Sequence, residues 1–300
     1  MKNSLLILVI LLPLQLSAQQ VADTSYNPPV TNPEYTTGIG PVVFIDEGHY
    51  NFHTKDGRYL AFAKLLERDG YVVRSYSGEF NKGKLARGNV LVIANALNKI
   101  NEEAWYEPIL PAFSEKETKV VEKWVKAGGS LFLIADHMPF GGAAKNLAAK
   151  FGFELTDGYA IDTTKKGLDI FSLQNGTLKE CVFTNGRNSD EKIDKIVSFT
   201  GQAFMIPPDA ISVMEFSRNY ISIKPDSAGR SSLKNSKITN VGGWYQGAYK
   251  SYGKGKVAVF GEAAMFSAQL AGPLKRQMGM NNNEKQNYRF LLNIIHWLDE

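Results

Sequence analysis

The chain has 300 residues, of which 44% are hydrophobic and 21% are charged, and this ordinary globular composition excludes disordered and fibrous proteins. Its 34 basic and 30 acidic residues give a net charge of +4, and their dispersal along the chain argues against a dedicated nucleic-acid binder. The single cysteine excludes both an internal disulfide and a cysteine-based zinc knuckle.

Residues 1–18 have the pattern of a signal peptide. Lys2 precedes an apolar run over residues 5–16, and Ser17 and Ala18 offer a small-residue cleavage site. The run is shorter than the roughly 20 residues that a membrane-spanning helix needs. We therefore expect an exported protein, periplasmic or secreted, with no membrane span after signal removal. An uncleaved anchor is the alternative.

Residues 19–40 are rich in Pro, Thr and Asn and predict an extended lead-in. Beyond them the chain alternates between two patterns. Continuous apolar runs, typical of strands buried on both faces of a parallel sheet, lie at residues 42–45, 71–73, 90–93, 131–135 and 257–260. Amphipathic helices are predicted at about residues 57–70, 114–128, 143–151 and 284–298. A capping box, Ser114 with Glu117, marks the start of the second helix.

Between about residues 156 and 243 the pattern changes to short β-like pieces broken by Gly, Asn, Ser and Pro. We interpret this region as an irregular β-rich elaboration of one domain that covers residues 41–299. Alternation of strands and helices predicts an α/β fold, a three-layer sandwich with a mostly parallel central sheet. Sheets of this kind bind ligands beyond the carboxyl ends of their strands.

Polar side chains follow four of the predicted strands at that edge. The residues are Asp46, Glu47, His49, Asn51 and His53 after the first strand, Asn95 after the third, Asp136 and His137 after the fourth, and Glu262 after the fifth. Three of the four histidines therefore lie where a ligand site is expected. This grouping is the strongest functional signal in the chain.

The grouping favours a metal site. Imidazoles four residues apart beside carboxylates suit one divalent Zn, Mn or Fe ion and leave positions open for a substrate. The predicted ligands are Asp46, His49, His53 and Asp136, with His137 as an alternative. A bound metal would activate water, and Glu47 or Glu262 would act as the general base.

Two other interpretations stay open. In a metal-free site, His49 or His137 would be the acid or base, with its tautomer set by Asp46 or Asp136. Alternatively, the polar groups only cap turns and helix starts.

Other residues add smaller signals. Asn51 and Asn95 could orient a substrate, and Gly141 with Gly142 before a helix could present backbone N–H groups to an anion, although a plain tight turn explains them equally well. Cys181 is expected to be a buried, inert thiol. The sequence contains no G-x-S-x-G elbow, which argues against a serine hydrolase of that type. It also contains no P-loop and no G-x-G-x-x-G motif, which argues against nucleotide cofactors.

The residues at 46–54, 134–140 and 261–266 resemble those of an exported bacterial family in the class I glutamine amidotransferase-like superfamily. The resemblance covers about residues 41–298 and implies a flavodoxin-like α/β sandwich. Amidotransferases of this class carry a cysteine after the central strand, whereas Asp136 and His137 stand there in this chain. The resemblance therefore does not imply glutaminase activity.

The sequence predicts an exported hydrolase-type enzyme, metal-assisted, that acts on a small envelope or nutrient-derived substrate. The alternatives are a non-catalytic module that binds a saccharide, a peptide or a partner protein, and a scaffold subunit without a convergent pocket. The oligomeric state and the substrate are not predicted.

Overall fold

The structure is a computed structural model that describes residues 20–228, 235–282 and 286–300. Nine strands form its central sheet, and the five at one side run parallel. In spatial order these are β3 (Val72–Tyr76), β2 (Val42–Asp46), β4 (Val90–Ala94), β5 (Ser130–Ile134) and β15 (Gly255–Phe260). The protein is therefore an α/β protein with a mostly parallel main sheet.

The sheet continues with antiparallel strands beyond β15. These are β14 (Tyr245–Tyr252), β10 (Phe204–Met205) and β6 (Glu154–Leu155), and β11 (Ile211–Glu215) also pairs with β14. Strand β14 runs antiparallel to β15 on one side and pairs with β10 and β11 on the other, so it links the parallel strands to the elaboration.

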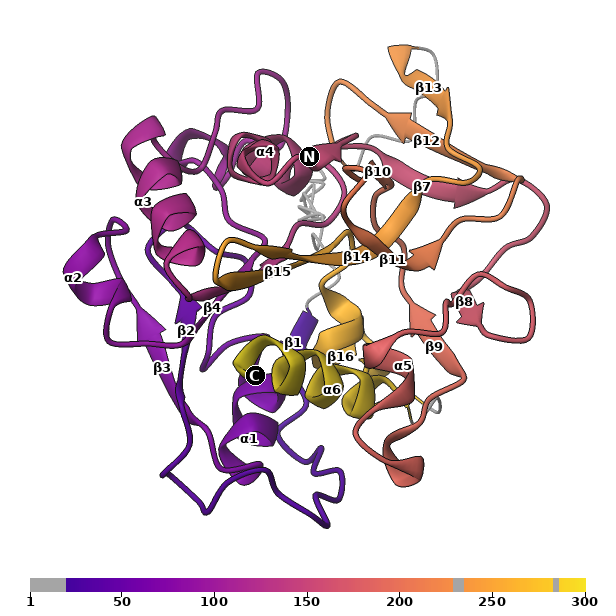
Figure 1. The fold of residues 1–300 in the computed structure, drawn as a ribbon. Helices are drawn as coiled ribbons and strands as arrows, with labels where there is room; N and C mark the ends of the chain where they lie inside the picture. The colour runs from indigo at the N-terminus through magenta and orange to yellow at the C-terminus, as the bar shows by residue number, and fades with distance from the viewer. Residues whose placement is uncertain (1–19, 229–234, 283–285) are drawn as a thin grey trace, which may run out of the picture.

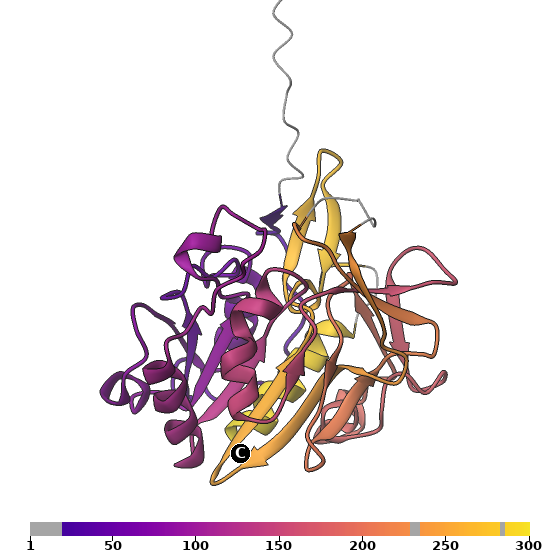
Figure 2. The same ribbon diagram turned by 90° about the horizontal axis from the view of Figure 1, so that it is seen from above.

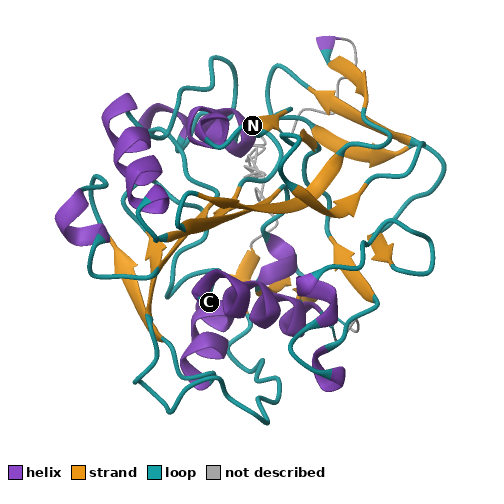
Figure 3. Ribbon diagram, in the orientation of Figure 1, coloured by secondary structure: helices purple, strands orange, loops and turns teal. Residues whose placement is uncertain are grey.

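Helices cover both faces of the sheet (Figures 1 and 3). On one face lie α1 (Leu60–Arg68) and α6 (Asn287–Asp299), and on the other lie α3 (Glu115–Lys126) and α4 (Phe140–Lys150). Successive side chains of a strand point to opposite faces of the sheet, so both faces of a buried strand need a cover. In β2, Val43 and Ile45 pack on the α1 side and Phe44 packs on the α3 side. The short helices are α2 (Lys82–Leu85), beside α3, and α5 (Val182–Asn185), beside α6.

The elaboration lies at the far side of the molecule from β3 (Figure 2). It contains one sheet of β13 (Lys237–Asn240), β12 (Tyr220–Lys224) and β7 (Tyr159–Asp162), and a pair of β8 (Asp169–Ser172) with β9 (Lys195–Ser198). A further small sheet joins β1 (Gln20–Ala22), β16 (Ala268–Ala271) and β17 (Arg276–Gly279). Single 3-10 turns lie at η1 (Lys99–Asn101), η2 (Ser189–Glu191) and η4 (Ala264–Phe266).

The predicted parallel strands and helices are confirmed, whereas the start of α4 differs from the prediction and the strands β1, β14, β16 and β17 were not predicted. Helix α4 begins at Phe140 rather than at residue 143, so Gly141 and Gly142 lie inside its first turn. The proposed signal peptide lies outside the described residues, and the helices within the described part of the chain are too short and too polar to cross a membrane.

Candidate functional site

A cavity of about 550 Å³, here called the strand-end pocket, lies at the carboxyl ends of the parallel strands. It contains polar side chains that follow β2, β4, β5 and β15, together with aromatic side chains from the surrounding loops. The polar residues are Gln20, His53, Arg58, Asn95, Asp136, His137, Thr200, Glu262 and Gln269, and the aromatic ones are Phe52, Trp105, Phe140, Tyr159 and Phe199. Five of the predicted site residues therefore meet in one cavity.

Asn95 determines the tautomer of His53. The backbone N–H of Asp136 donates to Asn95 Oδ1 at 2.9 Å, so the Asn95 Nδ2 group faces His53 Nδ1 at 3.4 Å. An amide N–H can only donate, and the neutral ring must then carry its proton on Nε2. Asn95 holds this position with a positive φ of 51°, a conformation that asparagine tolerates better than most residues.

The His53 ring is buried and neutral. Only 3% of the residue is exposed, and burial, with a smaller contribution from the charge of Arg58, lowers the pKa of His53 to about 3. Its Nε2 makes no hydrogen bond to any residue in the described part of the chain. His53 therefore lines the pocket and carries a buried N–H donor that lacks a partner among the described residues.

In its neutral form, His137 has a hydrogen-bond acceptor at Nε2, where His53 has a donor. Its Nδ1 donates to the backbone carbonyl of Met138 at 2.9 Å, which leaves the lone pair on Nε2, 3.7 Å from Asp136 Oδ1. The ring stacks on Tyr159 of the elaboration with centroids 4.0 Å apart. The His137 side chain is 22% exposed and lines the pocket.

Asp136 and Glu262 are neighbouring carboxyl groups with different surroundings. Asp136 Oδ1 accepts the N–H of His137 at 2.8 Å. Glu262 is 1% exposed and accepts the backbone N–H groups of Ala264 and Met265 at 2.6 and 2.8 Å. Burial, and next the negative charge of Asp136, raise the pKa of Glu262 well above its ordinary value. Glu262 can therefore keep its proton at a pH at which an exposed glutamic acid is ionised.

An aromatic wall closes one side of the pocket. Phe52, Trp105 and Phe140 contact one another with ring centroids 5.2–5.5 Å apart. The guanidinium of Arg58 lies 3.6 Å from the centroid of Phe52 and donates to the Phe52 carbonyl. Arg58 and these three aromatic residues were not predicted from the sequence, because single residues that lie away from the strand ends carry no periodic signal.

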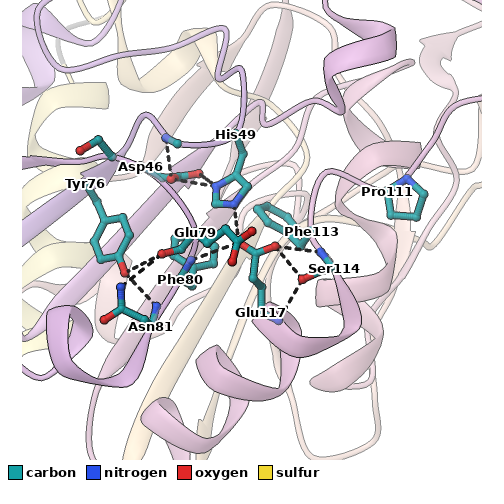
Figure 4. A network of polar contacts seen from close by, with 12 residues as sticks. Asp46, His49, Tyr76, Glu79, Phe80, Asn81, Pro111, Phe113, Ser114 and Glu117 are labelled. Carbon is teal, nitrogen blue, oxygen red and sulfur yellow. Dashed lines mark hydrogen bonds and ion pairs between the residues drawn. The ribbon is translucent and has the colours of Figure 1, made fainter.

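The predicted metal ligands Asp46 and His49 lie in a separate buried cluster (Figure 4). His49 Nδ1 contacts Asp46 Oδ2 at 2.9 Å, and its Nε2 contacts Glu117 Oε1 at 2.8 Å. Burial alone would lower the pKa of His49, but the two carboxylates outweigh it and raise this pKa to about 9. Burial likewise opposes ionisation of Glu117, yet hydrogen bonds from His49, Ser114 and Phe80 lower its pKa to about 2.

The other predicted residues support loops and turns. Asn51 donates to Asp46 Oδ2 at 2.9 Å and accepts the N–H of His49 at 3.0 Å. Glu47 accepts the backbone N–H of Lys55 at 2.7 Å and lines a neighbouring cavity rather than the strand-end pocket. These contacts place both side chains in the stabilisation of the loop that follows β2.

Gly141 and Gly142, the two glycines of α4, also contact groups of the protein itself. The N–H of Gly142 donates to Asp157 Oδ1 at 2.6 Å, so a carboxylate of the protein already sits at this helix start. A Cβ on Gly141 would lie 2.6 Å from the side-chain amide of Gln202, which donates to the carbonyls of Ala135 and Asp136. These glycines provide close packing behind the end of β5.

The arrangement does not fit the predicted metal. Both ring nitrogens of His49 already contact carboxylates, and His53 carries a proton on Nε2, the nitrogen without a protein partner. Within residues 20–228, 235–282 and 286–300, no three His, Cys, Asp or Glu side chains are grouped so as to hold an ion. A metal would require these side chains to rearrange, and no reaction step is derived from one here.

No family model matches the chain, and no curated protein matches its sequence. Similar solved structures include the mmIFT52 N-terminal domain, with 14% identity and a TM-score of 0.60 over 86% of this chain and 97% of that one. A cytoplasmic protein from Salmonella typhimurium LT2 has 16% identity and a TM-score of 0.51 over 86% of this chain and 99% of that one. At these identities the likeness concerns the fold alone, and the resemblance to the glutamine amidotransferase-like superfamily stays a prediction.

Proposed function

We propose that the protein binds a small polyhydroxylated molecule, of the saccharide class, in the strand-end pocket. The observation that carries this proposal is the fixed set of unlike hydrogen-bonding groups beside an aromatic wall. His53 Nε2 and Arg58 can only donate, whereas His137 Nε2 and the Asp136 carboxylate accept. A hydroxyl group both donates and accepts, so a molecule with several hydroxyls can satisfy all of them.

The aromatic wall supports the same class of ligand. Phe52, Trp105 and Phe140 offer apolar surface to the C–H face of a sugar ring, while its hydroxyls point to the polar groups. Charge is close to balanced, because Arg58 offsets Asp136 and the raised pKa of Glu262 favours its neutral form. A neutral ligand unit therefore suits the pocket better than a strongly charged one.

Acid–base hydrolysis of this ligand is a second candidate function. It is favoured by the raised pKa of Glu262 in a pocket that holds a second carboxyl group, Asp136, because such pairs can divide acid and base roles between them. Protonated Glu262 would give its proton to a leaving oxygen. His137 Nε2 would take a proton from the attacking water, and its Nδ1–H bond to Met138 holds the ring in the required tautomer. No metal takes part in this scheme.

Two further inferences concern the type of fold and the location of the protein. We infer a three-layer sandwich of the glutamine amidotransferase-like type, supported by helices on both faces of the sheet. We also infer export, which rests on the sequence of residues 2–18 alone.

The binding proposal is tested by isothermal titration with a panel of neutral mono- and disaccharides. The Asp136→Asn variant should weaken binding about ten- to hundredfold, because a hydrogen bond to a charged group contributes about 1.5–3 kcal/mol. Asp190→Asn, an exposed position outside the pocket, is the matched control and should bind as the wild type does. If no saccharide binds, or if both variants behave alike, the proposal is wrong.

The hydrolysis candidate needs a separate measurement on the saccharide that binds. Product formation from that saccharide is followed for the wild type and for Glu262→Gln. Turnover that disappears in the variant while affinity is kept supports proton donation by Glu262. Binding without turnover in the wild type leaves a binding protein.

A further inference from the structure

A second cavity, here called the Tyr50 cavity, adjoins the strand-end pocket. Its volume is about 580 Å³, and it is lined mainly by the loop that follows β2, with contributions from the loops after β3 and β4. Phe52 and Arg58 line both cavities and therefore lie at the boundary between them. A ligand that crosses this boundary would contact both residues.

Arg58 is a half-buried cation without an acidic partner. Its guanidinium lies against the Phe52 ring, and Nη1 donates to the Phe52 carbonyl at 3.0 Å. Arg58 makes no ion pair and no other side-chain hydrogen bond with any residue that the structure describes. Burial lowers the pKa of the Arg58 side chain, and no carboxylate offsets this effect. Because a guanidinium carries five N–H donors, Arg58 retains donors for a ligand at the boundary.

The charges that line the Tyr50 cavity favour a neutral ligand group. Arg58 shares this cavity with two carboxylates, those of Glu47 and Glu102. A ligand anion would be repelled by the carboxylates, and a ligand cation would be repelled by Arg58. Uncharged oxygen atoms, such as those of hydroxyl groups and sugar rings, can accept from Arg58 without either penalty.

Tyr50 gives the cavity an exposed aromatic ring. The residue is 41% exposed, and its side chain makes no hydrogen bond or ring contact within the described part of the chain. Its neighbours His49 and Asn51 are buried and both contact Asp46, so the loop is fixed on either side. Tyr50 itself has a φ of 47°, a left-handed conformation that is uncommon for a bulky residue. A rigid loop thus presents an apolar ring against which the C–H face of a sugar can pack.

We propose that the ligand is an oligosaccharide of at least two neutral units and that the Tyr50 cavity binds the second unit. The first unit occupies the strand-end pocket, Arg58 donates to oxygen atoms at the junction, and Tyr50 packs against the second unit. This inference rests on the proposed saccharide binding and adds the length of the ligand and the residues that recognise its second unit.

The first test compares monosaccharides with disaccharides by isothermal titration. The probes are glucose, galactose and mannose, and the neutral disaccharides maltose, cellobiose, lactose and mannobiose. The wild type should bind at least one disaccharide about tenfold more tightly than the monosaccharides of which it consists, the gain expected from one further ring packed on an aromatic side chain.

Variants of Tyr50 test where the second unit lies. Tyr50→Ala should weaken the disaccharide about five- to tenfold and leave the monosaccharide unchanged, whereas Tyr50→Phe keeps the ring and should retain the preference. Tyr106→Ala is the matched control, because Tyr106 is 58% exposed and lines neither cavity. It should bind both probes as the wild type does.

A variant of Arg58 tests the boundary. Arg58→Lys keeps the charge but replaces the planar set of donors by a single ammonium group, so it should weaken the disaccharide about threefold or more and the monosaccharide less. Arg68→Lys is the matched control, since Arg68 is also half-buried but lies at the other end of α1. It should change neither affinity.

The possible outcomes separate the two proposals. Equal affinities for mono- and disaccharides would overturn the second unit while leaving saccharide binding intact. A disaccharide preference that persists in Tyr50→Ala, or in Arg58→Lys, would overturn its placement in the Tyr50 cavity. Failure of every saccharide to bind would overturn the proposed function itself, and this inference with it.

Discussion

The buried cluster of Asp46, His49 and Glu117 allows a quantitative prediction for Glu117→Gln. The replacement keeps the size of the side chain but removes one of the two negative charges that contact the imidazole of His49. It also weakens the bonds that Glu117 accepts from Ser114 at the start of α3 and from the N–H of Phe80. The loop after β2 and helix α3 would then be joined less tightly.

The magnitude follows from the pKa of His49. This pKa rises from 6.5 to about 9, and a change of 1 in pKa corresponds to about 1.4 kcal/mol, so protonated His49 with its two carboxylates contributes about 3 kcal/mol to folding after the cost of its burial. Removal of the Glu117 charge should therefore lower the free energy of unfolding by about 2 kcal/mol at pH 6. Loss of one partner from a buried ion pair commonly costs a little more than this.

The loss depends on pH in a defined direction. Because the pKa of His49 is raised on folding, its contribution is complete below pH 6.5 and disappears as the pH rises through about 9. Because the pKa of Glu117 is lowered to about 2, its contribution is complete above pH 4.5 and disappears as the pH falls through about 2. The difference between wild type and Glu117→Gln should be greatest between about pH 4.5 and 6.5 and should fall below about 1 kcal/mol at pH 10.

Urea unfolding of wild type and variant at pH 6 and pH 10, followed by tryptophan fluorescence, measures both differences. Glu115→Gln is the matched control, since Glu115 lies in the same first turn of α3 and its side chain is 67% exposed. Its cost should stay below about 1 kcal/mol. Equal losses for the two variants at pH 6, or a loss in Glu117→Gln that is the same at both pH values, would refute the ion-pair reasoning.

Three further changes have expected outcomes. Asp136→Asn should lower the pKa of Glu262 towards its ordinary value, because the charge beside it is gone, and carboxyl infrared absorption across a pH titration measures this shift. Gly141→Ala should destabilise the protein by about 1–3 kcal/mol in urea unfolding, because the added methyl group would lie 2.6 Å from a buried side-chain amide, whereas Gly83→Ala meets its nearest atom at 3.8 Å and should not destabilise. Cys181 is 7% exposed and burial raises the pKa of its thiol, so a thiol reagent should label one group only after unfolding; rapid labelling of the native protein would contradict this.

The parallel strands could be predicted because nearly all their side chains are apolar. Strands such as β4 and β5 are buried on both faces, and continuous apolar runs are the only sequences that suit such positions. Strand β14 escaped notice because it carries polar residues in buried positions. Gln246 is fully buried, and Lys250, only 7% exposed, is held by an ion pair with Asp209. The sequence does not show a partner so far along the chain.

The site could be predicted in part for a related reason. Parallel strands place their carboxyl ends at one edge, so the meeting of Asn95, Asp136 and Glu262 follows from topology. The direction of each side chain in a loop does not follow from topology. His49 turns towards α3 because Glu117 supplies a second carboxylate there, and in the sequence Glu117 gave only the signal of a capping box.

The stacking of Tyr159 on His137 joins the strand ends to the elaboration. The sequences of these two regions are constrained by the fold to different degrees. The strand ends are held by the pairing of the parallel sheet, so their polar groups cannot change place without disturbing the fold. Tyr159, Ile161 and Thr200 belong to the elaboration, whose short strands pair mainly with one another. Exchange of this one region in related chains would therefore change the lining of the pocket while the polar groups at the strand ends stay in place. Transplanting residues 156–243 would be a direct route to altered specificity.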